Sequence, residues 1–424
     1  MSRRRALTAA AAAGLALPIA SAARALPEPQ RPAAPWGRGR RVRIATFNTS
    51  MYRATEGALL TDLASGTDEQ IRAVARIIQV NNPDVVLLNE VDYDATGQVL
   101  DLLRRKYLEV PQNGSTPVFY PYAFTAPVNT GVPSGLDLDG DGRTDGPGDA
   151  WGFGAFPGQF GMLVLSRFPI LTDQVRTFQN LRWSQMPGNL LPEGYYSPQA
   201  AGVLRLSSKS HWDVPVRMGW RTLHVLVAHP TPPAFDGPEK RNARRNHDEI
   251  RFWADYLTPG EQSEWIVDDA GRRGGLGDAE RFVILGDYNA DPVKGDSWPG
   301  AISQLLLHPR VQDPKPVSAG AAEAAERIAK EKPELRSAIP RGDAPALADP
   351  AALSCESDTA DFSDEEGMGT LRVDYVLPSS NLTVASSGVF WPAAGTPGAE
   401  LVAVGPAVSS DHRLVRVDLD ISPR

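Results

Sequence analysis

The stretch Pro83-Asp84-Val85-Val86-Leu87-Leu88-Asn89-Glu90 joins four consecutive apolar residues to an amide and a carboxylate. An unbroken apolar run that follows the turn signal Asn82-Pro83 predicts a strand covered on both faces. Similar runs recur at residues 42–47, 162–165, 223–228, 282–285, 372–377 and 413–419. We therefore expect several buried strands along most of the chain.

A helical pattern lies between the first two of these strands. Thr67 and Gln70 are spaced as a capping box, and Ile71, Val74 and Ile78 recur with helical periodicity. A second helix is predicted over residues 239–251, where three arginines share one face as a solvated surface or as a cationic rim for a phosphorylated substrate. Strands alternating with helices predict an α/β protein.

Polar side chains stand directly after the apolar runs of several predicted strands. Loop ends at one edge of a rigid sheet are where catalytic groups gather, although any single polar residue can simply solubilise a strand end. The residues are Asn48, Glu90, His229, Asp287 and Asn289. As a set they predict a site at one sheet edge.

Residues 1–25 predict a signal peptide. Arg3, Arg4 and Arg5 precede a short alanine-rich apolar stretch and the Ala23-Arg24-Ala25 cleavage pattern, which favours twin-arginine export to the secreted or cell-envelope side. The apolar stretch is too short to span a bilayer. Residues 26–40, rich in Pro, Gly and Arg, predict a tether.

Composition narrows the classes of function. The chain has 424 residues, a formal charge of −8 and one cysteine, Cys355, which excludes an internal disulfide. Removing residues 1–25, which hold four arginines and no acid, deepens the charge to −12. This acidity disfavours indiscriminate nucleic-acid binding, which needs a cationic surface.

We expect one domain over 41–424 with insertions at 111–158 and 314–370, the second containing a helix at 321–330.

Seven short motifs stand in order along the chain. They are Thr46-Phe47-Asn48, the stretch at 83–90, Ser166-Arg167-Phe168-Pro169-Ile170, Ala228-His229-Pro230, Gly286-Asp287-Tyr288-Asn289, Arg372-Val373-Asp374-Tyr375 and Ser410-Asp411-His412. Together they resemble the endonuclease/exonuclease/phosphatase superfamily, which includes DNase I-like nucleases, inositol-polyphosphate phosphatases and bacterial sphingomyelinases. The resemblance implies a four-layer α-β-β-α sandwich, with two mixed β-sheets flanked by helices.

Phosphate-ester hydrolysis needs a cation, an oriented water and a stabilised leaving oxygen. Glu90 is the first candidate ligand for Mg²⁺ or Mn²⁺, with Asn48 beside it. Asp287 would position or deprotonate the water, with Asn289 holding the water or a phosphate oxygen. His412 would bind phosphate or transfer a proton.

The resemblance implies further roles. It pairs Asp374 with His412, makes Asp411 another metal-side ligand, and makes His229 a second histidine that contacts phosphate or acts as general acid. Arg167 either binds phosphate or pairs with a carboxylate. The chain departs from the common family pattern at Asn89, Ala228 and Leu414, none of which removes a catalytic group.

Residues 137–149 read DLDGDGRTDGPGD and resemble the first part of a calcium loop. The twelfth position is Gly148 instead of Glu, so a true EF-hand is excluded, whereas a shorter extracellular loop fits. A merely acidic, solvated loop is the alternative. The candidate calcium ligands are Asp137, Asp139, Asp141 and Asp145.

These features predict a secreted, divalent-metal-dependent phosphoesterase that hydrolyses phosphate mono- or diesters by in-line attack of an activated water. Its substrate would be a small phosphorylated compound or a phosphodiester. An extracellular DNase I-like nuclease is the first alternative, and a calcium-stabilised, non-catalytic surface protein is the second. Neither a membrane span nor an obligate protein partner is indicated.

Overall fold

The computed structural model describes residues 41–331, 355–362, 368–402 and 408–421. The predicted signal peptide (1–25), the tether (26–40) and parts of the predicted insertion at 314–370 lie outside the described residues. A search of the described helices finds none whose length and apolarity would let it cross a bilayer.

Every strand expected from the apolar runs is present, and further short strands join them. The strands are β1 (Arg41–Met51), β2 (Val85–Val91), β3 (Tyr122–Phe124), β4 (Met162–Ser166), β5 (Arg176–Thr177), β6 (His211–Met218), β7 (Arg221–Ala228), β8 (Phe282–Asp287), β9 (Ala360–Phe362), β10 (Gly369–Leu371), β11 (Asp374–Pro378), β12 (Thr383–Val389) and β13 (Val415–Asp420). The α-helices are α1 (Ala58–Ser65), α2 (Glu69–Asn81), α3 (Gln98–Leu103), α4 (Pro198–Val203), α5 (Arg241–Tyr256), α6 (Ser303–Leu306) and α7 (Ala319–Glu331).

The strands form two large mixed sheets. The first has the order β12-β13-β1-β2-β4-β3, and the second has the order β11-β8-β7-β6-β5. Each sheet contains one parallel pair, β1 with β2 and β7 with β8, and its other pairs are antiparallel. A separate two-stranded sheet pairs β9 with β10.

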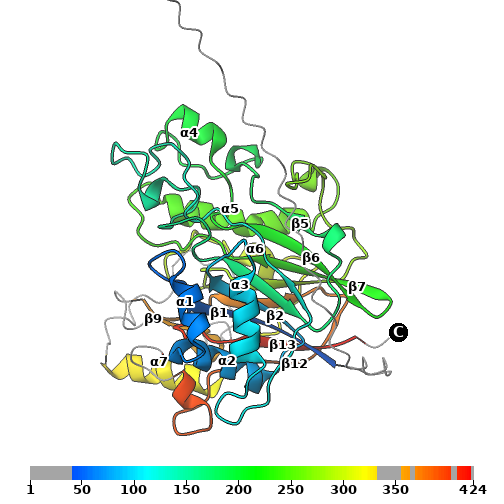
Figure 1. Cartoon of the computed structure of the whole chain (residues 1–424). Helices are drawn as coiled ribbons and strands as arrows, with labels where there is room; N and C mark the ends of the chain where they lie inside the picture. The colour runs from blue at the N-terminus through cyan, green and yellow to red at the C-terminus, as the bar shows by residue number, and fades with distance from the viewer. Residues whose placement is uncertain (1–40, 332–354, 363–367, 403–407, 422–424) are drawn as a thin grey trace, which may run out of the picture.

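The sheets are covered on both faces, which explains the unbroken apolar runs. Val225 and Val227 of β7 join the core cluster that contains the buried residues of β1 and β2. Leu226 and Ala228, which alternate with them, join a second cluster with Ile250 and other residues of α5. Figure 1 shows α5 over the second sheet, and α1, α2 and α3 over the first. The fold is therefore the predicted sandwich of two mixed sheets flanked by helices.

Helix α2 starts one residue later than its predicted cap. Asp68, and not Thr67, is the N-cap, and its side chain accepts a hydrogen bond of 2.9 Å from the backbone of Ile71. Gln70 does not close a capping box. Its amide instead donates to the backbone oxygens of Ser50 (2.8 Å) and Ser409 (3.0 Å), and so ties α2 to the end of β1 and to the loop before β13.

The two long stretches without strand rhythm are partly built into the sheets. Residues 122–124 of the first form β3, an edge strand paired with β4. The described part of the second contributes α7, as expected, and β9. Residue Ala360 of β9 also bridges to His412, so this stretch reaches the predicted site.

Candidate active site

The predicted catalytic side chains meet at one edge of the sandwich because of strand direction. β1 and β2 are parallel, as are β7 and β8, so Asn48, Glu90, His229 and Asp287 all stand at carboxyl ends of strands. β11 runs antiparallel to β8 with Asp374 directly opposite Asp287. Asp411 and His412 precede β13, which pairs antiparallel with β1, and so reach the same edge.

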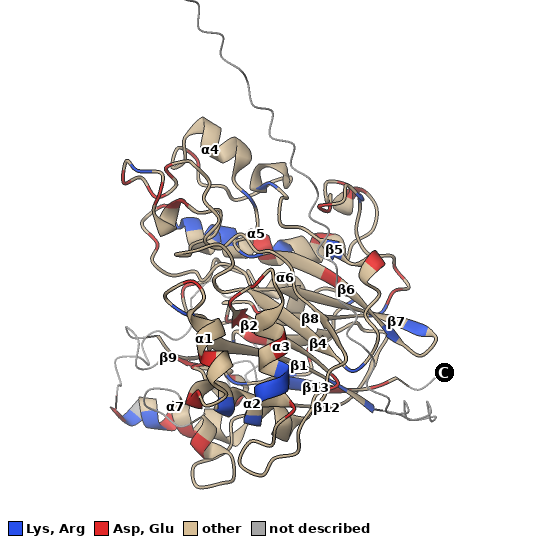
Figure 2. Ribbon diagram, viewed as in Figure 1, with Lys and Arg blue, Asp and Glu red and all other residues tan. Residues whose placement is uncertain are grey.

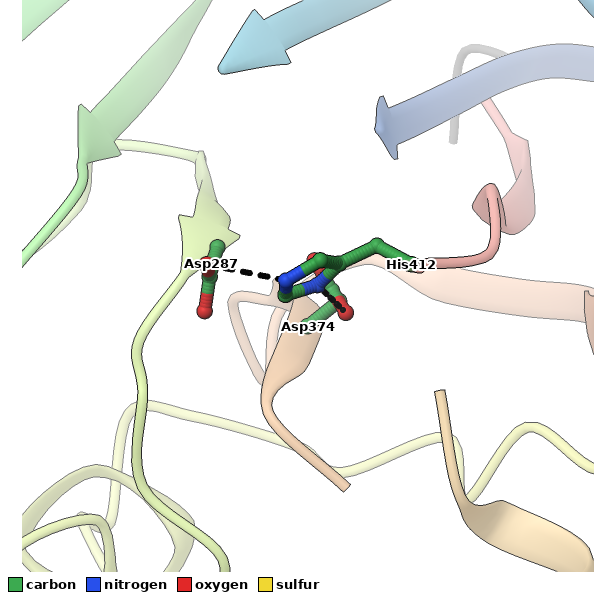
Figure 3. Close-up of side chains that lie close together, drawn as sticks. All are labelled: Asp287, Asp374 and His412. Atoms are coloured by element: carbon green, nitrogen blue, oxygen red, sulfur yellow. Dashed lines mark hydrogen bonds and ion pairs between the residues drawn. The ribbon is translucent and has the colours of Figure 1, made fainter. Parts of the chain in front are cut away.

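Asp287, His412 and Asp374 form a buried relay of carboxylate, imidazole and carboxylate (Figure 3). Nδ1 of His412 lies 2.8 Å from Oδ2 of Asp374, and its Nε2 lies 3.6 Å from Oδ2 of Asp287. Burial by itself would lower the pKa of His412, but the two carboxylates raise it well above its ordinary value. The two carboxylates therefore favour the imidazolium form of His412.

Asp287 is held as a carboxylate. Burial by itself would raise its pKa, but the charge of His412 and hydrogen bonds from its neighbours hold that pKa well below the usual range. The amide of Asn48 donates to Oδ2 over 3.0 Å, and the backbone N–H of Asn289 donates to Oδ1 over 2.9 Å. An anionic oxygen fixed from several sides suits the orientation of a water molecule.

His229 differs from His412 in charge. Its Nε2 lies 3.4 Å from Oδ2 of Asp287 and 3.9 Å from Oε1 of Glu90. Burial, and then the neighbouring Lys209, lowers the pKa of His229 to about 4. The site thus pairs a neutral imidazole with a charged one, and His412 is the one that carries a proton to give.

Glu90 lies beside the other predicted metal-side residues. Burial, reinforced by the charge of Asp411, raises its pKa to about 7, whereas His412 and Asn48 act in the opposite direction. Oδ1 of Asp411 accepts hydrogen bonds from the hydroxyls of Ser50 (2.8 Å) and Ser410 (3.3 Å). A partly buried carboxyl with a raised pKa is poised to exchange its proton for a cation.

The donor set fits a hard divalent cation. The site brings together four carboxylates, those of Glu90, Asp287, Asp374 and Asp411. Only two groups, His412 and Lys209, supply positive charge beside them. Ligand atoms of Asp287, Asp374 and His412 lie within 4.8 Å of one another, but an imidazolium does not ligate a metal. The oxygen donors of Glu90, Asn48 and Asp411 are the better cradle for Mg²⁺ or Mn²⁺.

Backbone strain gathers around the site. Five of the nine non-glycine residues with positive φ among the described residues line a cleft of about 290 Å³ that opens on Asp287 and His412. Positive φ is uncommon for any residue with a β-carbon and is an outlier for bulky ones. The five are Ser50, Glu90, Phe160, Phe235 and Asn289.

Two residues of the site carry no signal that sequence reasoning could use. Thr359 lies in a stretch predicted to be an insertion, yet its hydroxyl donates to Asp374 over 2.8 Å. Lys209 is 5% exposed, and its charge is felt by His229, Glu90 and Asp287. A lone Thr in a polar loop and a lone Lys before a strand are common, and only the tertiary structure brings them to the site.

Arg167 lies at the opposite edge of the first sheet from the other predicted site residues, which favours its structural role over phosphate binding. It follows β4, whose end pairs with the start of β2 and not with the end that carries Glu90. Its guanidinium contacts Asp84 at 3.2 Å and the side chain of Asn82, and it lies over the ring of Tyr120. Arg167 is the structural arginine that the alternative interpretation described.

The acidic loop brings together a different set of carboxylates from the one predicted. Oxygens of Asp137, Asp139 and Asp149 lie within 4.8 Å of one another. Asp145 instead pairs with Arg143 at 3.0 Å, and Asp141 accepts from the backbone of Arg143. Asp149, which the loop spacing did not single out, is 1% exposed and accepts from the backbone N–H groups of Leu138 and Gly146.

Arg245 of α5 turns away from any cationic rim. It is buried, and its guanidinium donates to the backbone oxygens of Leu206, Arg205 and Trp151. The helix therefore uses this arginine to fasten loops. It does not offer it to a substrate.

Comparisons with known proteins agree with these motifs. Residues 45–412 match the Endonuclease/Exonuclease/phosphatase family, and no curated protein matches the chain. Solved structures that cover 90% of this chain include an endonuclease/exonuclease/phosphatase from Beutenbergia cavernae (17% identity, 72% of that chain, TM-score 0.46), TDP2 from C. elegans (14%, 75%, 0.41) and the human Nocturnin catalytic domain with bound sulfate (14%, 94%, 0.43).

The family match spans all the site residues from Asn48 to His412. The chain belongs to the Endonuclease/Exonuclease/phosphatase family, whose named activities all hydrolyse phosphoester bonds.

Proposed function

We propose that this chain is a secreted, divalent-metal-dependent phosphoesterase that hydrolyses phosphate mono- or diesters by in-line attack of water. The observation that carries the proposal is the buried relay in which His412 lies 2.8 Å from Asp374 and 3.6 Å from Asp287, an arrangement that favours an anionic Asp287 beside a protonated His412. An anion to orient water beside a cation to receive negative charge is what hydrolysis of a phosphoester requires.

Glu90 would hold Mg²⁺ or Mn²⁺, with Asn48 and Asp411 completing the protein side of the site. The bound cation would neutralise charge on the phosphoryl oxygens. Deprotonated Glu90 is the form that binds it, so proton and metal compete for the same carboxylate.

Asp287 orients the attacking water and takes its proton as the new bond between the water oxygen and phosphorus forms. The bond between phosphorus and the leaving oxygen breaks, and His412 supplies the proton for that oxygen. Asp374 fixes the imidazole of His412 through Nδ1, and Nε2 is thereby turned toward Asp287, where the water would be oriented. His229, neutral, donates or accepts a hydrogen bond beside Asp287, and Asn289 holds the water or a phosphate oxygen.

Two further parts of the proposal rest on sequence patterns. Export rests on the arginines and apolar stretch of residues 1–25. Calcium binding at the acidic loop rests on the alternating aspartates of 137–141, and the clustering of Asp137, Asp139 and Asp149 supports it. Outside the cell, where calcium is abundant, this ion would hold the loop in shape.

The test is hydrolysis of bis-p-nitrophenyl phosphate with and without Mg²⁺. Wild type should be active only with a divalent cation, and His412→Ala should lose activity by about 10²–10⁴-fold, as expected for a lost acid–base group. His308→Ala is the matched control, because His308 contacts Thr258 and Arg310 and is not among the residues of the cleft. Equal inactivity of wild type and His412→Ala on diesters, monoesters and DNA would refute the proposal.

A further inference from the structure

The cleft that opens on Asp287 and His412 has a polar floor and an aromatic rim. The catalytic carboxylates and His412 form one part of its lining, and Pro232, Pro233 and Ala234 form an apolar strip beside them. The rim residues are Tyr52, Phe160, Phe235 and Phe362. Such a rim offers apolar area to whatever is attached to the phosphate.

Among the described residues, the rim carries no positive charge with which to hold a second phosphate. None of the described residues that line the cleft is Lys or Arg, and Asp296 on the rim is exposed. Figure 2 shows lysines and arginines on α2, α5 and α7 and at the start of β7, and none of them is among the described residues that line the cleft. A polyanion would therefore meet repulsion at the rim, whereas a single phosphate needs only the floor.

Phe235 is the most exposed large apolar side chain described, at 91%. It is held there by a backbone with φ of +57°, which a bulky residue rarely adopts. An exposed phenyl ring on a strained backbone at the mouth of a catalytic cleft stabilises nothing in the free protein. It gains contact area only when a ligand covers it.

Another wall of the cleft is formed by an aromatic pair. The rings of Tyr52 and Phe160 lie 4.5 Å apart, and Tyr52 is 41% exposed. The buried carboxylate of Asp92 accepts from the backbone N–H of Phe160 (3.2 Å) and of Arg53 (2.9 Å), the residue after Tyr52. One side chain thus holds both halves of the wall, which is preformed for a ligand.

We propose that the substrate is a phosphodiester with a single negative charge and an apolar substituent that lies between Phe235 and the pair formed by Tyr52 and Phe160. This assignment rests on the phosphoesterase activity proposed above and names its substrate class. The floor binds the phosphate, and the rim recognises the substituent by buried apolar area. Additional phosphate groups on such a compound do not raise its affinity for the cleft.

The experiment measures inhibition of bis-p-nitrophenyl phosphate hydrolysis by diesters that differ only in their substituents. Dibenzyl phosphate and dimethyl phosphate are both monoanions, and dibenzyl phosphate should inhibit at least tenfold more strongly. Phe235→Ala should reduce this ratio to threefold or less. Trp220→Ala should preserve it, because Trp220 is a similarly exposed aromatic residue at the opposite end of the hairpin of β6 and β7.

A second pair tests charge. The dinucleotide TpT should inhibit at least as strongly as pTpT, which carries an additional terminal phosphate. Equal inhibition by the dibenzyl and dimethyl esters, an unchanged ratio in Phe235→Ala, or tenfold stronger inhibition by pTpT would each overturn the inference while metal-dependent hydrolysis stands. Absence of any hydrolysis by wild type would instead remove the proposed function, and this inference with it.

Discussion

The hydroxyl of Thr359 donates to Oδ2 of Asp374, the same oxygen that binds Nδ1 of His412. The hydroxyl oxygen also accepts from the backbone N–H groups of Val373 and Asp374. A threonine outside the seven motifs thereby orients the carboxylate that orients the catalytic imidazole.

Replacing Thr359 by Val should lower kcat about fivefold and leave KM nearly unchanged, because the relay loses one hydrogen bond of about 1 kcal/mol. The two backbone donors left buried should also lower the free energy of unfolding by about 1–3 kcal/mol. Steady-state kinetics and urea unfolding measure the two effects. Thr359→Ser keeps the hydroxyl and should restore kcat; a Ser variant as slow as the Val variant would argue against the orienting role.

Glu90 should make stability depend on pH and metal. Because its pKa is raised from 4.5 to about 7 in the folded protein, its protonated form favours folding. In EDTA this contribution is present at low pH and is lost as pH rises from about 4.5 through 7. Mg²⁺ should restore stability above pH 7, where the carboxylate is available to it.

The measurement is the Tm of wild type and of Glu90→Gln, both in EDTA, at pH 5 and pH 8. The Tm of Glu90→Gln relative to that of wild type should be higher at pH 8 than at pH 5, because glutamine carries no charge at position 90 at pH 8. Parallel pH profiles for the two proteins would show that Glu90 does not titrate as described.

Gly286 should resist substitution by alanine. A β-carbon there would lie 2.2 Å from the backbone oxygen of Ala228, next to His229, and the residue has φ of +154°. Gly286→Ala should therefore cost about 2 kcal/mol or more in urea unfolding and displace β7 from β8. Gly202→Ala in α4 is the control, because its β-carbon would meet nothing within 4 Å and alanine favours a helix. Comparable losses at both positions would contradict the clash.

Arg167→Ala should reduce stability and spare catalysis. Its ion pair with Asp84 is partly buried, and its loss should cost about 1 kcal/mol of unfolding free energy. Turnover of bis-p-nitrophenyl phosphate should change by less than twofold, because Arg167 is at the far sheet edge. A large rise in KM would instead restore the phosphate-binding role.

Calcium should protect the loop at 137–149 from proteolysis, and chelation should remove that protection. Asp139→Asn should mimic chelation, since Asp139 is one of the three clustered carboxylates. Asp173→Asn, which changes an exposed aspartate elsewhere, should not. Protease cleavage at the same rate with calcium, with EDTA and in Asp139→Asn would leave the loop merely acidic.

Sequence reasoning succeeded where periodicity and strand ends determine position. The run before Glu90 predicted β2, and strand direction alone brings Glu90 and Asp287 to one edge. It failed where a contact joins distant segments. Thr359 was missed because only the tertiary structure brings its hydroxyl to Asp374. The two roles of Arg167 stayed open because a motif says nothing about which edge of the sheet its strand ends at.

The same reasoning applies to Thr67 and Asp68. Both are good helix caps, and the choice between them depends on Gln70, whose side chain is occupied by Ser50 and Ser409. A capping box is a local pattern, and a tertiary contact of Gln70 overrides it.

The positive φ angles around the cleft imply a trade-off between thermal stability and catalytic activity. Each residue with a positive φ lowers the free energy of unfolding by of order 1 kcal/mol or more. The summed cost of the five is therefore comparable to the 5–15 kcal/mol by which a typical domain is stable. Laboratory selection for heat resistance alone should therefore accept glycine at Ser50, Glu90 or Asn289 early. The selected variants would be more stable but catalytically inactive. A screen for stabilised variants must therefore measure activity in the same round.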